Sequence, residues 1–257
     1  MERDTLKRMA SLFRKTLKNN NSDILTKEYI QSLGYDVEEV GYRIFLIKDF
    51  ITEQERTSII DIAQSASQED WEYHYMQGVM QMAKLKFNRQ DIDNLVKEGL
   101  YEITTNWIDK TLIIQDENLR TGMAQRAQEI FNFRDDLVFN GCGTIQRQYE
   151  GVPLVDHVDD HTDNSLMYAS VFYLNDDYTD GEVYFVNQNI EMRPPIRSLL
   201  VFPTSEEWRH GVREVGAGPH RYVIPSFISK KDFWKKHEQN NYNIEKTLQD
   251  AKGGDHV

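Results

Sequence analysis

The 257-residue sequence contains one cysteine, Cys142, and so it cannot form an internal disulfide. A single thiol also cannot supply the thiolate clusters that bind zinc or iron–sulfur groups. Any bound metal must therefore be held by histidine, aspartate or glutamate. The sequence has no run of about 18 apolar residues, and charged residues interrupt its first 21 positions, unlike a membrane span or a signal peptide. We expect a soluble cytoplasmic protein without a membrane partner.

Basic residues are fewer than acidic ones, 30 against 42, and the formal net charge is -12. Proteins that grip nucleic-acid phosphates gain affinity from concentrated Lys and Arg, so we expect no nucleic-acid partner. The composition is otherwise globular, with 39% hydrophobic and 28% charged residues. The length allows one large or two small domains.

Helical spacing of apolar residues marks the first 40 positions. Between Leu6 and Leu17 an apolar stripe would line a helix whose other faces carry Lys and Arg. Such a helix can lie on a membrane or on nucleic acid, but a stripe this short favours docking against the rest of the protein. A second short helix is expected to end near Gly34. Residues 1–40 are thus predicted to be an N-terminal helical extension.

A strand followed by a helix is expected to open the main domain, residues 41–232. The run RIFLIKDFI, from Arg43, is typical of a strand. Thr52 and Glu55 then form a capping-box pattern for a helix that ends near Ser67. Further helical patterns cover residues 91–112 and 123–131, and residues 233–257 are predicted to form a C-terminal helix and tail.

Short β-rich segments follow one another from Gly143 onward, separated by turn residues. In order they are TIQRQY, PLVDHV, SLMYASVFYLN, GEVYFV, RSLLVF, WRHGV and HRYVIPSFI. Many short strands in succession indicate a barrel or a jelly roll. We therefore expect an α+β fold with a mainly β core.

His157 and Asp159 are two positions apart in one of these segments, so both side chains would leave the same face of a strand and could bind one ion. The pattern alone is weak evidence. Chance gives about one such match, because 42 of the 257 residues are acidic and the chain has seven histidines. His161 and Asp163 form a second match.

A third ligand type and an anchor lie in later segments. His210 would complete two histidines and a carboxylate, the ligand set of non-haem iron(II) oxygenases. Arg221, in the segment HRYVIPSFI, could bind the distal carboxylate of a cosubstrate through a paired, charge-assisted contact. His220 is a rival ligand and Arg213 a rival anchor, although His220 would point to the opposite face of the strand from Arg221.

Five motifs occur in a fixed order between Ile145 and Ile228. They are Tyr149-Glu150-Gly151, His157-Val158-Asp159, Tyr173-Leu174-Asn175, the run Asp180 to Phe185, and His210-Gly211-Val212 with Arg221-Tyr222. Together they resemble the catalytic core of the prolyl 4-hydroxylase branch of the iron(II)/2-oxoglutarate-dependent dioxygenases. Asp180 stands where the family usually has the first glycine of a pair.

This resemblance implies a double-stranded β-helix (jelly roll, cupin-like) over about residues 143–228, with packed N-terminal and flanking helices. It favours His157 and Asp159 over the second pair, and it implies that His157, Asp159 and His210 hold the metal. It further implies that Arg221, Tyr173 and Tyr149 bind the cosubstrate. His161 and Asp163 then fall on the loop after the metal strand, where they would meet substrate or solvent.

The activity implied is hydroxylation of a prolyl or other side chain of a protein or peptide, with release of succinate and carbon dioxide. The cofactors implied are iron(II), 2-oxoglutarate and O2, with ascorbate as an additional candidate. Two alternatives differ from this prediction. One is a non-catalytic β-helix binding module, because a fold does not fix a function. The other is a related oxygenase that acts on a small molecule.

Overall fold

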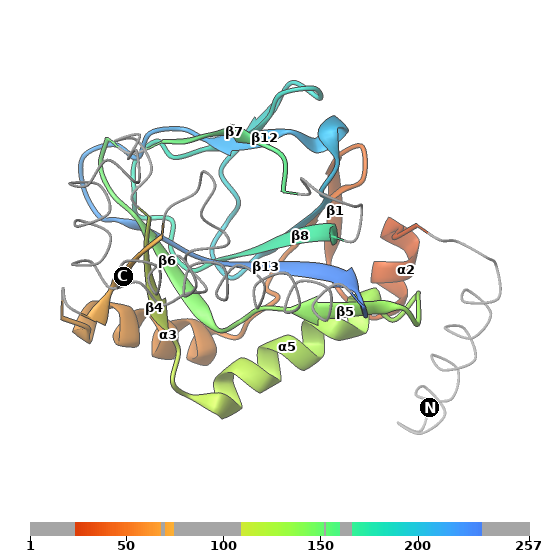
Figure 1. The fold of residues 1–257 in the computed structure, drawn as a ribbon, viewed down its shortest axis with the longest axis horizontal. Helices are drawn as coiled ribbons and strands as arrows, with labels where there is room; N and C mark the ends of the chain where they lie inside the picture. The colour runs from red at the N-terminus through yellow and green to blue at the C-terminus, as the bar shows by residue number, and fades with distance from the viewer. Residues whose placement is uncertain (1–23, 68–69, 75–108, 152, 160–165, 233–257) are drawn as a thin grey trace, which may run out of the picture.

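Two antiparallel β-sheets face each other, and helices cover the outer face of the larger sheet (Figure 1). The computed structural model describes residues 24–67, 70–74, 109–151, 153–159 and 166–232. The predicted basic N-terminal helix, the C-terminal helix, and His161 with Asp163 lie outside these ranges. Within them, no helix is both long and apolar enough to cross a membrane.

In the part of the chain that the structure describes, the larger sheet has nine strands. Their order is β1 (Val37–Gly41), β2 (Ile44–Ile47), β11 (Leu199–Pro203), β8 (Leu166–Tyr173), β13 (Arg221–Lys230), β6 (Thr144–Gln148), β4 (Asp109–Ile113) and β3 (Glu72–His74), with β5 (Leu137–Asn140) also paired to β13. The smaller sheet has the order β10 (Ile190–Met192), β9 (Val183–Phe185), β12 (His210–Val212) and β7 (Leu154–His157). This arrangement confirms the predicted α+β fold with a jelly-roll core.

The larger sheet is buried on both faces where β8 and β11 cross its centre. Tyr168 and Phe172 belong to the core between this sheet and the helices, whereas Ala169 and Tyr173 belong to the core between the two sheets. The alternation follows from the two-residue period of a strand. It explains why this region reads as a nearly continuous apolar run rather than as a simple in-and-out pattern.

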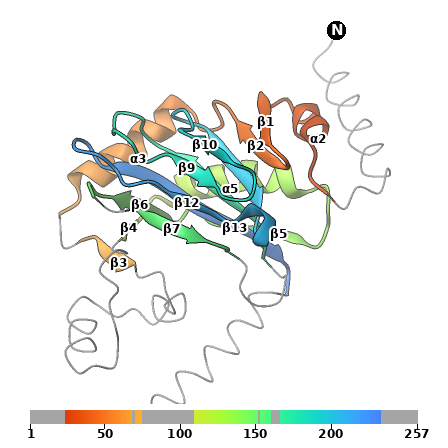
Figure 2. The same ribbon diagram turned by 90° about the horizontal axis from the view of Figure 1, so that it is seen from above.

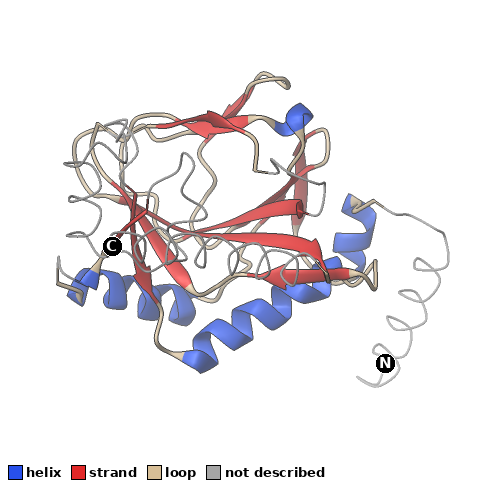
Figure 3. Cartoon of the chain, viewed as in Figure 1, coloured by secondary structure: helices blue, strands red, loops and turns tan. Residues whose placement is uncertain are grey.

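Among the described residues, three α-helices accompany the sheets: α2 (Lys27–Ser32), α3 (Glu53–Ser65) and α5 (Glu117–Phe131) (Figure 3). The predicted capping box of α3 is present, with the Thr52 side chain accepting from the Glu55 amide and the Glu55 side chain accepting from the Thr52 amide. Helix α5 begins six residues before the predicted start at Met123, because the Asp116 side chain caps it.

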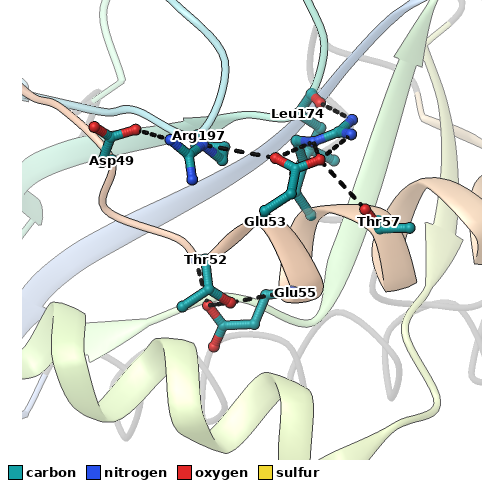
Figure 4. Close-up of polar contacts among 8 residues, drawn as sticks. Asp49, Thr52, Glu53, Glu55, Thr57, Leu174 and Arg197 are labelled. Atoms are coloured by element: carbon teal, nitrogen blue, oxygen red, sulfur yellow. Dashed lines mark hydrogen bonds and ion pairs between the residues drawn. The ribbon is translucent and has the colours of Figure 1, made fainter.

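The polar contacts at the start of α3 tie this helix to the end of β8 (Figure 4). Arg197 donates its amide to the Tyr173 carbonyl at 2.8 Å, and its guanidinium lies between Asp49 and Glu53. Arg56 pairs with Glu53 and reaches the Leu174 carbonyl at 3.4 Å. The strand end that carries Tyr173 is therefore fixed from the helical layer.

Two sequence predictions about this region are wrong. The sheet does not begin near Gly143, since β1 and β3 to β5 precede that residue beside the predicted strand β2. Residues 109–112 were expected to end a helix, yet they belong to β4, which pairs with β6. The buried Leu112 and Ile114 alternate there with Ile113, which is 46% exposed. Pairing with β6 outweighs the helical period of the local sequence.

The described part of the N-terminal segment packs against the same core as the rest. Leu25 and Ile30 are buried in the core between the larger sheet and the helices, and β1 extends that sheet beside α2 (Figure 2). The predicted division at residue 41 therefore stays a prediction, as does the one at residue 232.

Candidate metal centre

The smaller sheet brings two histidines face to face. In the pairing of β12 with β7, His210 lies opposite His157, and their ring centroids are 4.5 Å apart. Close approach at this point requires Gly211. A Cβ atom there would lie 2.6 Å from the Leu154 carbonyl oxygen and 2.4 Å from the Tyr184 hydroxyl.

Asp159 completes a three-residue cluster. One of its carboxylate oxygens is 3.5 Å from His157 Nε2, and the other is 3.7 Å from His210 Nε2. One potential ligand atom from each residue lies within 4.8 Å of the others. The three side chains are about one-tenth exposed, so an ion held there would be sheltered without being enclosed. The structure thus brings together the three residues that the sequence singled out.

The ring of His210 is oriented for metal binding. Its Nδ1 is 3.0 Å from the Trp208 carbonyl oxygen, which can only accept, so Nδ1 carries the proton and Nε2 presents its lone pair. Burial lowers the pKa of His210, so the ring is neutral near pH 7. Phe185 and Phe202 pack against it and against each other, with ring centroids 5.6 Å and 4.5 Å from that of His210. A neutral, oriented imidazole fits a divalent metal.

The main-chain segment before His210 is itself held by the β1–β2 turn. The Trp208 indole donates to the Tyr42 carbonyl at 2.8 Å, and the two rings stack at 6.0 Å. The guanidinium of Arg43 lies 5.3 Å from the Trp208 ring centroid. The turn therefore supports the carbonyl that orients His210.

A buried arginine lies in the same interior. Arg221 is 4% exposed, and one of its terminal nitrogens donates to Gln148 Oε1 at 3.1 Å. Its guanidinium lies 5.2 Å from the ring centroid of Tyr173. No acidic side chain among the described residues forms an ion pair with it. Its Nε also has no hydrogen-bond partner there, which is the condition of a receptor for an external carboxylate.

Tyr173 stays a hydrogen-bond donor over a wide pH range. Burial raises the pKa of its phenol to about 12, although the charge of Arg221 opposes this shift. Tyr173 packs in the inter-sheet core with Phe185 and Phe202, the same rings that contact His210. Metal cluster and arginine therefore share one interior.

Asn175 fixes Arg221 relative to Tyr173. Its amide nitrogen donates to the His220 carbonyl at 2.8 Å, and its oxygen accepts from the Tyr222 amide, also at 2.8 Å. These two backbone groups flank Arg221, and Asn175 itself lies two residues after Tyr173. One side chain thereby clamps both halves of the predicted cosubstrate anchor.

Tyr149 lies beside Arg147 and His220. Its hydroxyl accepts from Arg147 at 2.9 Å, and its ring packs edge-on against His220 at 4.9 Å. Ile145 belongs to the core between the larger sheet and the helices, and the Arg147 guanidinium lies over the ring of Trp71 in the same core, so strand alternation predicts that Tyr149 is on this side too. His220, the rival ligand, lies there too.

Arg213, the rival anchor, lies on the surface. It pairs with Glu191 at 2.6 Å and its guanidinium is 4.2 Å from the Tyr184 ring centroid. The left-handed turn before β9 accommodates the unusual Asp180, whose φ is 54°, a conformation that Asp tolerates better than most residues.

Sequence reasoning missed two residues beside Arg221. Gln148 faces Arg221 because these two residues are directly paired between β6 and β13. Tyr178 is 1% exposed, and its hydroxyl lies beside the guanidinium. Gln148 could have been found from the sequence, because side chains alternate along a strand and Gln148 must therefore point to the opposite face from Ile145. Nothing in the loop sequence signals the burial of Tyr178.

Comparison with known families locates the match within the β core. Residues 144–229 match the family described as the 2OG-Fe(II) oxygenase superfamily. The matched segment contains His157, Asp159, His210 and Arg221. No curated protein matches the sequence.

Solved structures of prolyl hydroxylases are similar to this chain at low identity. A viral collagen prolyl hydroxylase from Paramecium Bursaria Chlorella virus-1, in complex with 2OG, is 15% identical, with coverage of 74% of this chain and 97% of that one and a TM-score of 0.49. A prolyl-4-hydroxylase from Pseudomonas putida is 18% identical, with coverages of 68% and 99% and a TM-score of 0.42. A Trichoplax adhaerens prolyl hydroxylase, in complex with a hypoxia inducible factor peptide fragment, is 14% identical, with coverages of 70% and 92% and a TM-score of 0.42.

Proposed function

We propose that this protein is a dioxygenase that hydroxylates a prolyl or other side chain of a protein or peptide, because residues 144–229 match the 2OG-Fe(II) oxygenase superfamily. The observation that carries the proposal is the convergence of His157, Asp159 and His210 within 4.8 Å. Arg221, buried in the same interior, supplies the second half of the argument.

The three clustered residues would hold iron(II). Two neutral imidazoles and one carboxylate are the ligand set that leaves coordination positions free in non-haem iron(II) oxygenases. The hydrogen bond from His210 to the Trp208 carbonyl keeps that ring in the tautomer a metal needs. The donor set, its neutrality and its spacing therefore fit the metal that the family uses.

Arg221 and Tyr173 would hold the distal carboxylate of 2-oxoglutarate. The guanidinium supplies paired donors and a positive charge, and the phenol supplies a neutral donor. When bound, iron(II), 2-oxoglutarate and O2 supply the oxidising chemistry that hydroxylates a C–H bond and releases succinate and carbon dioxide. The chain itself would orient the cosubstrate and exclude water from the site. The apolar rings of Phe185 and Phe202, which pack beside His210, would help to exclude the water.

The substrate class rests on the order of the motifs around the site. Tyr173-Leu174-Asn175, Gly181-Glu182 and His210 with Arg221 follow one another as in the prolyl 4-hydroxylase branch. We therefore propose a side chain of a protein or peptide as the hydroxylated group. Ascorbate would serve, as in that branch, to keep the metal reduced.

The test is succinate production by the purified protein with iron(II), 2-oxoglutarate and a panel of peptides. His157→Ala should abolish iron(II) binding and turnover together. Arg221→Ala should leave iron(II) binding intact and lower the affinity for 2-oxoglutarate by about a hundredfold or more, because the charge pair between the guanidinium and the carboxylate is lost.

Matched controls come from the rival residues. His220→Ala and Arg213→Ala make the same chemical changes outside the proposed site, and both variants should retain iron(II) binding and 2-oxoglutarate affinity. Undiminished turnover in His157→Ala or Arg221→Ala would contradict the assignment. Iron(II) binding without any succinate production from the whole panel would favour the binding module.

A further inference from the structure

We propose that Tyr178 is a second tyrosine of the 2-oxoglutarate carboxylate receptor, donating its hydroxyl beside Arg221 and Tyr173, and that Arg193 is the positioning residue that holds it there. This inference rests on the proposed function. It starts from two buried donors that the fold itself leaves unused.

The hydroxyl of Tyr178 is buried without a partner. The residue is 1% exposed, and its oxygen lies beside the Arg221 guanidinium but outside hydrogen-bonding geometry with every residue that the structure describes. An unsatisfied buried hydroxyl is costly, so a fold retains one only where something else satisfies it. The neighbouring Arg221 Nε is in the same condition within the described ranges.

A carboxylate is the ligand that satisfies both donors at once. It has two oxygens with about four acceptor positions, and its negative charge balances the positive charge of the guanidinium. Gln148 already occupies one terminal nitrogen of Arg221 through its side-chain oxygen, at 3.1 Å. The free edge of the guanidinium is therefore the one that includes Nε, and Tyr173 and Tyr178 both lie beside Arg221.

Arg193 fixes the position of Tyr178 from outside. Its guanidinium donates to the Tyr178 carbonyl at 3.1 Å and to the Asp180 carbonyl at 2.9 Å, and it lies 5.1 Å from the Tyr178 ring centroid. It also pairs with Glu182 at 3.3 Å. These contacts hold the loop 178–182 as one unit.

Gly181 closes the other side of the ring. A Cβ atom at this position would come within 3.2 Å of Tyr178 Cε2, and its φ of 70° disfavours other residues. The phenol therefore has little rotational freedom before a ligand arrives. A donor that is fixed in advance loses little entropy on binding.

The expected consequence is specificity for the distal carboxylate. Tyr178→Phe should lower the affinity for 2-oxoglutarate by about tenfold or more, which is the effect expected from the loss of a hydrogen bond to a charged group. It should not change the affinity for 2-oxopentanoate, which lacks that carboxylate. Binding is measured by calorimetry on the anaerobic iron(II)-loaded protein, so the readout does not depend on turnover.

The matched control is Tyr168→Phe. Tyr168 is also buried, but its hydroxyl faces the helical side and accepts from Arg43 and from the Leu25 amide. Without ligand, Tyr178→Phe should melt at the same or a higher temperature than the wild type, since it removes an unsatisfied group. Tyr168→Phe should melt lower and bind 2-oxoglutarate normally.

Arg193→Met tests the positioning role. It should lower the affinity for 2-oxoglutarate less than Tyr178→Phe does. The double variant should bind 2-oxoglutarate as tightly as Tyr178→Phe alone, because both substitutions remove the same interaction. Additive losses would overturn the link between the two residues.

The outcomes separate this inference from the proposed function. If the wild type bound no 2-oxoglutarate, the proposed function would fail first. If the wild type bound it and Tyr178→Phe bound it equally well, only the role of Tyr178 would fail. Equal losses for 2-oxoglutarate and 2-oxopentanoate would show a distorted site and would also overturn the role.

Discussion

Asn175 sets the geometry of the anchor through two backbone groups on either side of Arg221. In Asn175→Asp the oxygen that accepts from the Tyr222 amide remains, but the donor to the His220 carbonyl is lost, and Asp177 becomes a like-charged neighbour. We expect 2-oxoglutarate to bind about tenfold more weakly, while iron(II) affinity stays unchanged because the proposed metal ligands lie on other segments of the chain. Titration of each ligand separately measures this split.

The control is Asn187→Asp. The Asn187 amide is exposed and donates only to the Glu206 carbonyl among the contacts of the described residues, so neither affinity should change. A parallel loss of iron(II) and 2-oxoglutarate affinity in Asn175→Asp would mean that Asn175 stabilises the fold in general and does not position the anchor.

At the residue scale, the clustering of His157, Asp159 and His210 could be predicted from sequence. Two ligands two positions apart share a strand face, and the ordered motifs selected this pair over His161 and Asp163. The roles of Gln148 and Tyr178 could not be predicted, because they depend on strand register and on the burial of one loop.

At the scale of elements, α3 depends on its capping box. Thr52→Ala removes the side chain that accepts from the Glu55 amide, so we expect the free energy of unfolding to fall by about 1 kcal/mol. Urea denaturation measures the change. Thr57→Ala makes the same substitution four residues after the first helical residue, where alanine favours the helix, and should be neutral or slightly stabilising. Equal losses in both variants would contradict the capping explanation.

Elements with a strong local signal were predictable, and elements defined by pairing were not. The capping pattern at Thr52 fixed the start of α3 from sequence alone. The helical pattern predicted over residues 91–112 runs into strand β4, and the pairing of β4 with β6 could not be predicted from that pattern. The three-residue strands β3, β9, β10 and β12 likewise depend on pairing with their neighbours, because each is too short to be stable alone.

For the whole molecule, burial predicts a loss of stability in alkali. Burial raises the pKa of the Cys142 thiol and of the Tyr173 phenol to about 12 each. The unfolded chain releases these protons at about pH 8.5 and 10, whereas the folded protein keeps them. The contribution of these two groups to the free energy of unfolding is therefore fully present below about pH 8. It falls with rising pH by up to about 1.4 kcal/mol per pH unit for each group.

Urea unfolding between pH 7 and 11 measures this slope. Cys142→Ala should remove the part that begins near pH 8.5, and Tyr173→Phe the part that begins near pH 10. An unchanged slope in both variants would contradict the assignment. The same burial keeps Cys142 unreactive, so thiol reagents should modify it only in unfolded protein.

Because His157 in β7 is paired with His210 in β12, the three-residue cluster can form only late in the synthesis of the chain. Chains leave the ribosome from the N-terminus at about 5–20 residues per second. A nascent chain that stops before His210 carries His157 and Asp159 but lacks the strand that faces them, and Arg221 emerges later still. If these residues hold iron as proposed, it can be captured only after His210 has been made, so a translation product truncated before His210 cannot hold a redox-active metal in this site.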